Sequence, residues 1–576
     1  MENIEIAALL SETADLMEIA GEDPFRIRSF RNGATVIETF PERVAGMVAD
    51  PERDVTVIPG IGKGLAAVLK EIVARGSFER RDLMLQKYPP TALELLKIQG
   101  LGPKSIALLF EHYRVSSVDD LERICREGKL RLLPRMGEKL EQKVLRSIES
   151  YRRSASRYLL DHADRVAAEL SAYLAQTPGV ERVTPAGSLR RGRETVGDVD
   201  LLVTGPDPGA VLERFLAFPK VREVLARGGN KTSAKIGHEA IQVDVRVLEP
   251  GSFGSAMQYF TGSKGHNVAL RNRAIQMGLK LSEYGLFRTS DDVKVGGETE
   301  EEIYLKLNLK WIPPELRENG GEIEAAAEDR LPELVELEQI RGDLHAHTVE
   351  TDGRNTIAEL VEAARAMGYQ YLAITDHSKA LAMANGLDEK RLVAQIQQVR
   401  RAAAELDFPI LAGCECDIRQ DGRMDLDDEA LAQLDVVVGS IHSFLNMEPA
   451  AMTDRLLRAL ENRYLQILGH PTGRLLLRRE GFGFDFERVA GEAARRNIHF
   501  EINASPERLD LSSAMVRAAQ AQGAKFVIST DAHHLRHLEN MKYGVQTARR
   551  GWLGPEDVLN TREVEGLRAA LRRGKR

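Results

Sequence analysis

In the first half of the chain, two aspartates spaced two apart, Asp198 and Asp200, open an apolar run that ends at Val203. Side chains on a strand alternate between its faces, so both carboxylates point the same way. Such a pair alone would more often mark a solvated strand end. A third acid, Asp244, lies in the apolar run 240–247. If the two strands pair, three aspartates converge and can hold two Mg²⁺ or Mn²⁺ ions, which clamp the oxygens of a phosphoryl transfer.

The residues just before these aspartates are suited to hold a phosphate. Gly187 and Ser188 are expected to begin a helix, whose free N–H groups bind phosphate oxygens together with the serine hydroxyl. The run 187–200 as a whole resembles the nucleotidyltransferase signature of the family X DNA polymerases. The run 259–271 is similar to the nucleotide-selection segment of that family. The resemblance implies a DNA-directed DNA polymerase that adds dNTPs to a primer 3′-end.

By the same resemblance, the incoming nucleotide is bound by residues of both runs: Gly187, Ser188, Arg191, Gly197, Tyr259, Phe260, Gly262 and Asn267. Ser188 and Arg191 would hold the triphosphate. Tyr259 and Phe260 would crowd the sugar and disfavour a ribose 2′-hydroxyl, and Asn267 would touch the base edge.

The resemblance also implies roles for the acids and for one arginine. Asp198 and Asp200 would hold both metal ions. Asp244 would bind the catalytic ion and promote loss of the proton from the 3′-hydroxyl. Arg271 would reach the minor groove of the template.

Two glycine pairs near the start of the chain, Gly60 with Gly62 and Gly100 with Gly102, each precede an apolar helical run. This spacing forms a tight turn whose outward N–H groups bind a DNA phosphate without reading sequence. One such pair would most often be only a turn, but two copies resemble helix-hairpin-helix elements. A weaker third copy has Arg135 in place of its first glycine. In family X members, elements of this kind grip the two sides of a gap.

The run 25–31 mixes aromatic and basic residues, including Arg26. It is either an ordinary amphipathic helix or part of a pocket for a 5′-phosphate, in which Arg26 is our DNA-binding candidate. Animal relatives carry a lyase lysine on the helix after the first hairpin, and the matching residue here is Val68. Lys63 and Lys70 lie nearby but out of register, so lyase activity is in doubt because Schiff-base chemistry needs an aimed amine.

In the second half, apolar runs alternate with helical runs, which predicts a parallel α/β barrel. A single His after a strand is usually a satisfied core residue. Here six of the seven predicted strands end in His, Asp or Glu, and such ends form the active face of these barrels. Imidazole and carboxylate groups suit Zn²⁺, Mn²⁺ or Fe²⁺, and nine candidates fit about three divalent ions. The candidate ligands are His345, His347, Asp352, His377, Glu415, His442, His470, Asp531 and His533.

This half resembles the PHP (polymerase and histidinol phosphatase) superfamily, a distorted seven-stranded barrel with a trinuclear metal centre. All nine positions expected from that resemblance are filled. It implies a metal-dependent 3′→5′ exonuclease with 3′-end processing and AP endonuclease activity.

Several other residues near the strand ends invite a functional interpretation. Cys414 and Cys416 flank Glu415, but strand alternation turns both thiols toward the helices, as small buried hydrophobes. His534 is expected to point away from the metal site. Arg474 and Arg508 follow strand ends, where they are either a phosphate clamp or ordinary surface arginines.

The composition fits a multidomain protein of the reducing cytoplasm. The chain has 576 residues, too many for one core, and 43% of them are hydrophobic. Its apolar runs are too short to span a membrane, and its start is no signal peptide. Three cysteines exclude a disulfide framework. A net charge of −8 speaks only weakly against DNA binding, because acids and bases gather in separate places. We therefore expect a cytoplasmic protein, on nucleoid DNA, and a monomer.

The predicted architecture starts with α-helical regions that carry the helix-hairpin-helix elements, continues with an α+β nucleotidyltransferase palm, and ends with an α/β distorted (β/α)7 PHP barrel. The predicted domains are an N-terminal helical DNA-binding domain (1–80), a second helical DNA-binding subdomain (81–154), the palm (155–250), the nucleotide-selection subdomain (251–316), a linker (317–338) and the PHP domain (339–576). The Pro- and Gly-rich linker implies two independent cores.

The combination resembles the bacterial and archaeal PolX repair enzymes, which implies filling of short gaps in base excision repair, with gapped or primer-template DNA and dNTPs as partners. Two alternatives remain. The PHP domain would act on a small phosphomonoester, or the protein would be a non-catalytic scaffold that binds DNA ends. The upstream hairpins speak against the first, and the filled ligand sets speak against the second.

Overall fold

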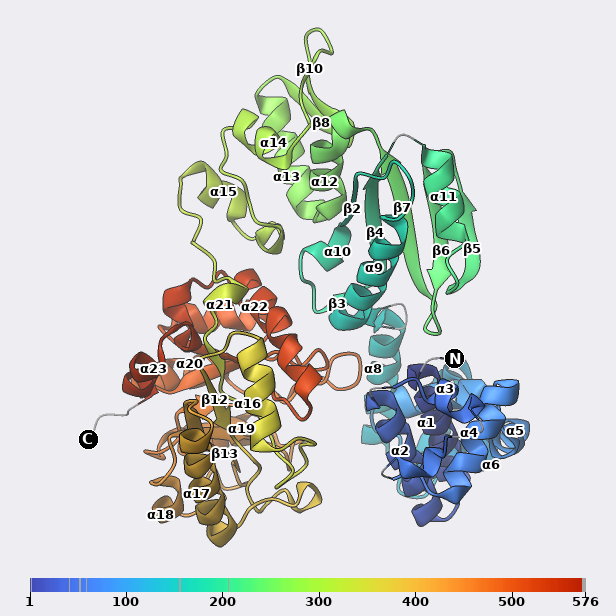
Figure 1. Ribbon diagram of the computed structural model, residues 1–576, viewed down its shortest axis with the longest axis vertical. Coiled ribbons are helices and arrows are strands. Elements are labelled where there is room, and N and C mark those ends of the chain that lie inside the picture. Colours follow the sequence, from blue (N-terminus) through green and yellow to red (C-terminus); the bar gives the residue numbers. More distant parts are fainter. Residues whose placement is uncertain are drawn as a thin grey trace. The chain divides into compact units, whose positions relative to one another are not determined.

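A computed structural model describes all residues of the chain except 2, 41, 51, 52, 59, 155, 156, 206 and 572–576 (Figure 1). The first residues of the predicted palm, 155 and 156, therefore lie outside the described part. The chain divides into two compact units, Met1–Ser156 and Arg157–Arg576. No helix among the described residues is long and apolar enough to cross a membrane.

The first unit is helical. Its α-helices are α1 (Asn3–Ile19), α2 (Pro24–Thr39), α3 (Val44–Ala49), α4 (Lys63–Arg75), α5 (Glu79–Lys87), α6 (Pro103–Tyr113), α7 (Val118–Arg126) and α8 (Glu138–Ser154). They share one hydrophobic core, which includes Ile6, Leu69 and Ile148. The first unit therefore has the helical structure that the sequence predicts.

Each predicted glycine pair precedes a helix in this unit, since α4 begins directly after Gly62 and α6 directly after Gly102. The first glycine of each pair has a positive φ, +91° at Gly60 and +96° at Gly100. An added Cβ at Gly100 would lie 2.9 Å from a methyl carbon of Leu140. Both turns thus need glycine for their backbone conformation, and the second also needs it for space.

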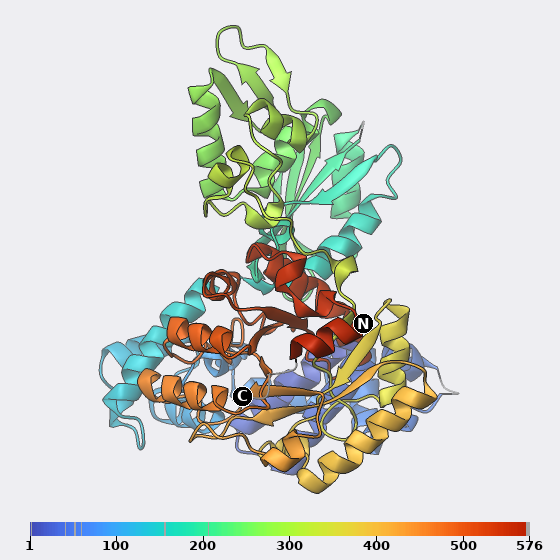
Figure 2. The ribbon, with the colours of Figure 1, turned by 90° about the vertical axis from the view of Figure 1, so that its left-hand side faces the viewer.

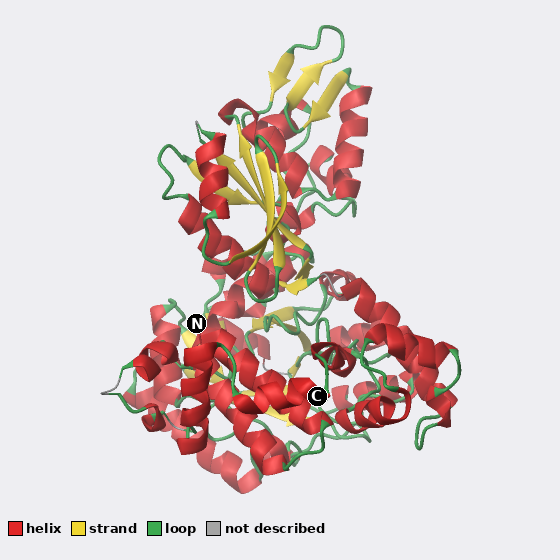
Figure 3. Ribbon diagram, turned by 90° about the vertical axis from the view of Figure 1, so that its right-hand side faces the viewer, coloured by secondary structure: helices red, strands yellow, loops and turns green. Residues whose placement is uncertain are grey.

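The second unit begins with a mixed sheet in the order β2-β4-β7-β6-β5. Its strands are β2 (Arg182–Pro185), β4 (Asp198–Thr204), β7 (Ile241–Leu248), β6 (Lys231–Ile236) and β5 (Val221–Arg227), and Figure 3 shows them in yellow. The helices α9 (Leu160–Leu174) and α11 (Pro208–Leu216) supply apolar side chains to its core. The strands β4 and β7 are parallel, with Asp200 opposite Asp244. This is the strand pairing that the sequence predicts.

A smaller subdomain follows the palm. It contains α12 (Phe253–Thr261), α13 (Lys264–Gln276), α14 (Glu300–Lys306) and an antiparallel sheet in the order β10-β9-β8, built from β8 (Leu279–Ser282), β9 (Gly285–Arg288) and β10 (Lys294–Gly296). The side chain of Glu300 accepts hydrogen bonds from Arg190 at 2.6 Å and Arg317 at 2.5 Å. Arg317 is fully buried. Part of the predicted linker is therefore packed into this subdomain.

The rest of the chain forms a parallel sheet whose seven strands, within the described residues 339–571, follow one another in sequence order from β11 to β17. They are β11 (Gly342–Asp343), β12 (Tyr371–Ile374), β13 (Ile410–Asp417), β14 (Val436–Ser440), β15 (Ile467–Leu468), β16 (His499–Asn503) and β17 (Phe526–Ser529). The N–H of His347 donates to the carbonyl of Ala532 at 2.8 Å, which links the first strand to the last. These strands form the predicted distorted barrel.

Helices surround this barrel (Figure 2). They are α16 (Ile357–Ala366), α17 (Glu389–Glu405), α19 (Pro449–Leu460), α20 (Phe486–Arg495), α21 (Ser513–Ala521), α22 (Met541–Arg550) and α23 (Val564–Leu571). Cys414 and Cys416 are fully buried and belong to the apolar layer that also contains Leu392 and Ile396 of α17. The prediction that both thiols face the helices is confirmed.

Candidate active sites and metal centres

The three aspartates of the palm converge at one end of the paired strands β4 and β7. Asp198 is exposed, Asp200 is half-buried and Asp244 is buried. Burial, together with the nearby charges of Asp198 and Asp244, raises the pKa of Asp200 to about 7. Such mutual repulsion favours a cation between the carboxylates, so the donor set fits divalent metal ions.

Asp244 has basic and polar neighbours that the sequence analysis did not identify. Lys231 of β6 lies with its Nζ 2.5 Å from Oδ2 of Asp244, and Gln242 donates to Oδ1 at 3.0 Å. Burial alone would raise the pKa of Asp244, but these hydrogen bonds hold it below its usual value. No sequence signal would have found Lys231, because its pairing depends on how β6 lies beside β7.

The turn that the sequence predicts to bind phosphate lies directly beside these carboxylates. It is the short helix α10 (Gly187–Arg190), which carries Ser188. Gly187 has φ +64°, and a Cβ on it would lie 2.9 Å from Oδ2 of Asp200. Only glycine lets the turn approach the acids so closely. Gly197 lies immediately before Asp198, between β3 (Thr195–Val196) and β4.

The two runs predicted to bind the nucleotide, 187–200 and 259–271, contact each other in the structure. Nη1 of Arg191 donates to the carbonyl of Thr261, and a Cβ on the neighbouring Gly262 would lie 3.1 Å from that same nitrogen. Nε of Arg191 donates to Glu318 at 3.1 Å. Arg191 is therefore held by protein groups on two sides.

The nucleotide-selection residues on α12 and α13 also contact one another. The rings of Tyr259 and Phe260 meet edge to face with centroids 5.1 Å apart. Nδ2 of Asn267 donates to the carbonyl of Tyr259 at 2.7 Å, and Arg271 donates to the carbonyl of Asn267 at 3.3 Å. The guanidinium of Arg246 lies 4.3 Å from the centre of the Phe260 ring. The four predicted residues are thus linked by one ring contact and by two hydrogen bonds from side chains to backbone carbonyls.

In the first unit, the predicted 5′-phosphate residues differ in their surroundings. Arg26 is exposed on α2. Arg31, in the same basic run, is paired with Asp15 at 2.9 Å and with Glu18. The charge of Arg31 is already balanced, so the run contributes less free positive charge than its sequence indicates.

The helix α4 carries Val68, which packs against the core of the first unit. Lys63 and Lys70 instead line a cavity of about 370 Å³, together with Arg53 and Asp54. Val68 is not among the residues that line this cavity.

The nine candidate ligands of the barrel gather around Glu415, which is buried on β13. Its Oε2 lies 2.8 Å from Nδ1 of His377, and its Oε1 lies 2.8 Å from Nε2 of His470 and 3.3 Å from Nε2 of His442. Three groups of side chains bring their ligand atoms within 4.8 Å of one another: His347 with Asp352, His377 and His533; His345 with His347 and Asp531; and His377 with Glu415 and His442.

The chemistry of this cluster fits metal ions. Nε2 of His345 and both ring nitrogens of His347 are buried, and the described residues give them no hydrogen bond. Burial, along with the neighbouring His533 and His377, lowers the pKa of His347 to about 4. Burial alone would lower the pKa of His345, His377, His442 and His533, but the neighbouring carboxylates raise it instead. The buried acids thus call for positive charge, which a divalent cation would supply in place of the protons on these imidazoles.

Two acids that were not among the predicted ligands contact the imidazoles of the cluster. Oε1 of Glu501 lies 2.7 Å from Nδ1 of His345, and Oδ1 of Asp417 lies 2.9 Å from Nδ1 of His442. Such bonds fix the orientation of a metal-binding imidazole. Asp417 lies two residues after Glu415, and Glu501 lies two before Asn503, so strand alternation would have found both.

The other candidates near the strand ends have protein partners. Arg474 pairs with Glu194 of the palm at 2.8 Å, and Nε of Arg508 lies 3.6 Å from Oδ2 of Asp531. The Nδ1 of His534 accepts the N–H of Arg536 at 3.1 Å, so its ring caps the following turn. Neither arginine is an isolated surface residue.

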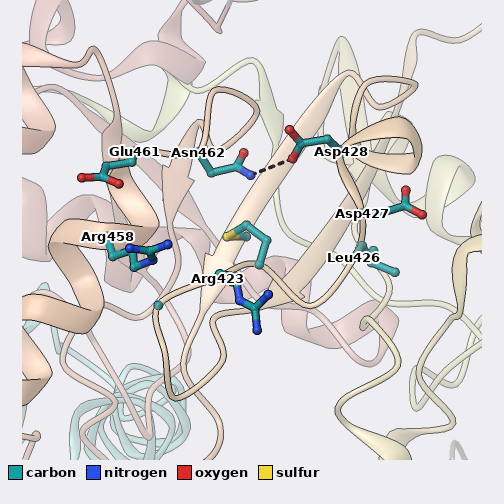
Figure 4. A pocket seen from close by; sticks show the side chains of 9 residues that line it. Arg423, Leu426, Asp427, Asp428, Arg458, Glu461 and Asn462 are labelled. Atoms are coloured by element: carbon teal, nitrogen blue, oxygen red, sulfur yellow. Dashed lines mark hydrogen bonds between the residues drawn. The ribbon is translucent and has the colours of Figure 1, made fainter.

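A cavity of about 330 Å³ lies elsewhere on the barrel half (Figure 4). Arg423 and Arg458 line it together with Asp427 and Glu461, while Asp428 and Asn462 are hydrogen-bonded to each other at 3.1 Å. Its lining contains none of the predicted site residues, and its charges are mixed. The largest cluster of functional groups is therefore not in this cavity.

Comparison with known proteins agrees with these observations. Four family models match: a helix-hairpin-helix domain (residues 1–78), a SAM-like helix-hairpin-helix tandem (92–150), the DNA polymerase beta thumb (256–318) and the PHP domain (343–505). The matches cover both predicted hairpin regions, the nucleotide-selection subdomain and most of the barrel.

Three relatives indicate how the parts combine. The chain is 38% identical, over 100% of both chains, to the DNA polymerase/3′-5′ exonuclease PolX of Bacillus subtilis (strain 168). It is 25% identical to DNA polymerase lambda of Rattus norvegicus over 55% of this chain and 56% of that one. It is 26% identical to a probable phosphatase of Thermoanaerobacter sp. (strain X514) over 41% of this chain and 95% of that one. The full-length identity to the first confirms the predicted resemblance, and this chain belongs to the PolX family of DNA polymerases with a PHP domain.

Proposed function

We propose that this protein fills short gaps in DNA during base excision repair and trims 3′-ends. It is a DNA-directed DNA polymerase with a PHP 3′→5′ exonuclease. The full-length identity to a PolX enzyme carries this conclusion, because it covers the polymerase and the barrel in one alignment. Finer activities, among them AP endonuclease action and 3′-end processing, are proposals that rest on the PHP half.

In the polymerase half, we assign the catalytic role to Asp198, Asp200 and Asp244. These carboxylates would hold Mg²⁺ or Mn²⁺, which supplies charge stabilisation for the attacking and leaving oxygens when bound. Asp244 would also bind the catalytic ion and so promote loss of the proton from the primer 3′-hydroxyl, and its low pKa keeps it ionised for ion binding. The approach of Gly187 to Asp200 supports a triphosphate held beside these acids.

The nucleotide would be bound by Ser188 and Arg191 at its phosphates, by Tyr259 and Phe260 at its sugar and by Asn267 at its base. The bond from Asn267 to the carbonyl of Tyr259 supports this assignment, since it holds the base-contacting and sugar-contacting residues in one arrangement. Gly197 and Gly262 would let the backbone approach the nucleotide.

In the barrel half, the nine residues around Glu415 would hold about three divalent ions, of Zn²⁺, Mn²⁺ or Fe²⁺. When bound, such ions supply a nucleophile at neutral pH and stabilise charge on a phosphate undergoing hydrolysis. Glu501 and Asp417 would orient two of the imidazoles. The burial of unpaired nitrogens on His345 and His347 supports this assignment.

The DNA would be gripped through the two hairpins, at Gly60, Gly62, Gly100 and Gly102. Arg26 would contact a 5′-phosphate, and Arg271 would contact the template strand. We further propose that the protein acts as a monomer on DNA in the cytoplasm. The two helix-hairpin-helix matches support the DNA contact.

One alternative has an observation in its favour. The match to a probable phosphatase covers 41% of this chain and 95% of that protein, and a PHP domain that acts as a phosphatase would take a small phosphomonoester as substrate. The two helix-hairpin-helix regions favour DNA over a small phosphomonoester as the substrate. Hydrolysis of a 3′-recessed duplex and of histidinol phosphate by the full chain, compared at equal concentration, distinguishes the two. We expect the duplex to be degraded faster.

The proposed function is tested by two assays on the full chain. With a gapped duplex, dNTPs and Mg²⁺ or Mn²⁺, we expect incorporation that stops when the gap is filled. Without dNTPs, we expect stepwise loss of nucleotides from a 3′-end. Absence of incorporation under all metal conditions would favour the non-catalytic scaffold instead.

A further inference from the structure

The helix α22 of the barrel half contributes to the surface of the palm. The side chain of Tyr543 is buried in the palm core, and its hydroxyl donates to Asp164 of α9 at 2.9 Å. Farther along the helix, Gln546 covers Gly192, where an added Cβ would lie 3.1 Å from its Cβ. Gly192 directly follows Arg191, so this helix lies against the loop predicted to bind the triphosphate.

The last residue of this helix, Arg550, contacts that loop directly. Its Nη1 donates to the backbone carbonyl of Arg191 at 2.7 Å and to Oε1 of Glu318 at 3.1 Å. Its side chain is only 5% exposed. Burial lowers the pKa of Arg550, and Glu318 opposes that shift. A buried guanidinium needs a partner to offset its desolvation, so this contact is not an incidental surface pair.

Glu318 is shared by three arginines. Its Oε1 lies 3.1 Å from Nε of Arg191, 3.1 Å from Nη1 of Arg550 and 3.8 Å from Nη1 of Arg193. Burial would raise the pKa of Glu318, but these cations hold it below its usual value, so the carboxylate is ionised. Three positive charges surround one negative charge, and the cluster as a whole still attracts an anion.

These contacts fix the plane of the Arg191 guanidinium. Glu318 binds its Nε, and the carbonyl of Thr261 binds its Nη1. The donors of a guanidinium form a rigid fork, so fixing two of them sets the direction of the third. The remaining nitrogen, Nη2, donates no hydrogen bond within the described part of the chain, and it is the one left to donate to a phosphate oxygen.

We propose that Arg550 and Glu318 are positioning residues of the nucleotide site, so that the barrel half completes the triphosphate pocket of the polymerase half. The inference rests on the proposed role of Arg191 in binding the triphosphate. The opposite role for Glu318 would be competition, in which its carboxylate occupies Arg191 in place of the triphosphate. The two roles predict opposite changes in KM.

The test measures KM for dNTP and kcat on a gapped duplex with the full chain. For Arg550→Ala and Glu318→Ala we expect KM to rise about tenfold, the effect of losing one charge-assisted hydrogen bond, with kcat changed by less than about twofold. Glu318→Gln keeps the acceptor oxygen and should raise KM less than Glu318→Ala. The 3′→5′ exonuclease rate of Arg550→Ala should equal that of the unaltered protein, although the substitution lies in the barrel half.

Arg549→Ala is the matched control. Arg549 precedes Arg550 on the same helix and bonds to Glu315 at 2.8 Å, but it makes no contact with Arg191. We expect its KM to stay within about twofold of the unaltered value, since no hydrogen bond near the triphosphate is lost. If Arg549→Ala raised KM as much as Arg550→Ala, general loosening of the interface would be the cause and the inference would be overturned.

Arg191→Ala separates the inference from the function on which it rests. If Arg191→Ala leaves KM unchanged, the proposed role of Arg191 fails. If Arg191→Ala raises KM while Arg550→Ala and Glu318→Ala do not, only the positioning inference fails. A fall in KM for Glu318→Ala would show competition instead. On the Arg191→Ala background, Arg550→Ala should add no further increase, and thermal melts of all variants should show folded protein.

Discussion

Oε1 of Glu194 and Nη2 of Arg474 lie 2.8 Å apart, which joins the loop before Asp198 of the polymerase signature to the loop after His470 of the barrel. Arg474 also donates to the carbonyl of Arg508 at 2.9 Å. The two halves of the second unit therefore share an interface. The expectation of two independent cores is wrong, since Leu509 and Tyr543 of the barrel half belong to the palm core.

Arg474→Ala should destabilise this unit. Both side chains of the pair are mostly buried, at 15% and 26% exposure. Removal of the arginine leaves Glu194 without its partner, at a cost of about 1–3 kcal/mol in unfolding free energy. Arg478→Ala is the control, because Arg478 pairs with Glu507 at an exposed site and its loss should change little. Denaturant unfolding measures the midpoint of each variant. If Arg474→Ala had the same midpoint as the unaltered protein, the pair with Glu194 would contribute nothing to stability.

The polymerase should prefer a short gap with a 5′-phosphate over the same gap without it. The exposed Arg26 and the hairpins motivate this expectation. Arg26→Ala should reduce the ratio of incorporation with the 5′-phosphate to incorporation without it. It should also reduce the slope of log DNA affinity against log salt concentration by about one. Arg126 is a suitable control, as it pairs with Glu122 on its own helix. Equal incorporation with and without the phosphate, in the unaltered protein, would contradict the prediction.

Lyase activity on a 5′-deoxyribose phosphate should be weak or absent. Val68 packs against the helical core and offers no amine. Borohydride trapping of the full chain on an incised abasic duplex measures the covalent intermediate directly. Efficient trapping that disappears in Lys63→Ala or Lys70→Ala would refute the prediction, and it would assign the chemistry to the cavity that these lysines line.

Glu501→Gln should weaken metal binding in the barrel. The fully buried Glu501 holds Nδ1 of His345 at 2.7 Å, and loss of such a bond typically costs about 10–100-fold in metal affinity. Metal content after dialysis, read by elemental analysis, is the measurement. His534→Ala is the control, since His534 adjoins His533 but caps a turn. Unchanged metal content in Glu501→Gln would show that His345 needs no such support.

Strand alternation and the carboxyl ends of parallel strands were enough to predict the candidate ligands of both sites, but the Lys231, Glu501 and Asp417 side chains that contact them were not among those predicted. The pairing of Asp200 with Asp244 and the cluster around Glu415 follow from local patterns. The contact of Arg550 with Arg191 joins residues far apart in sequence, so no local pattern indicates it.

The predicted linker shows another limit of composition. Its Pro and Gly residues and its charges are typical of a solvated segment, yet Glu322 is fully buried. Its Oε1 lies 2.6 Å from Nδ1 of His266, which is also buried. A charge can be buried wherever a distant partner is available, and sequence composition does not show that partner.

The central claim is that one chain carries two separate metal-dependent active sites, and a pair of substitutions tests it most directly. Asp244→Asn removes a proposed metal-binding carboxylate from the palm, and His345→Ala opens the barrel cluster. Each 1.36 kcal/mol of lost transition-state stabilisation is about tenfold in rate, so the loss of a ligand should lower its own activity by orders of magnitude. Thermal melts must show that both variants are folded, because bound metal stabilises the barrel.

Gap filling and 3′-end degradation should then be measured side by side in both variants. We expect that Asp244→Asn loses gap filling and keeps degradation, while His345→Ala loses degradation and keeps gap filling. Loss of both activities in either folded variant would contradict it and would indicate a single shared or obligately coupled centre.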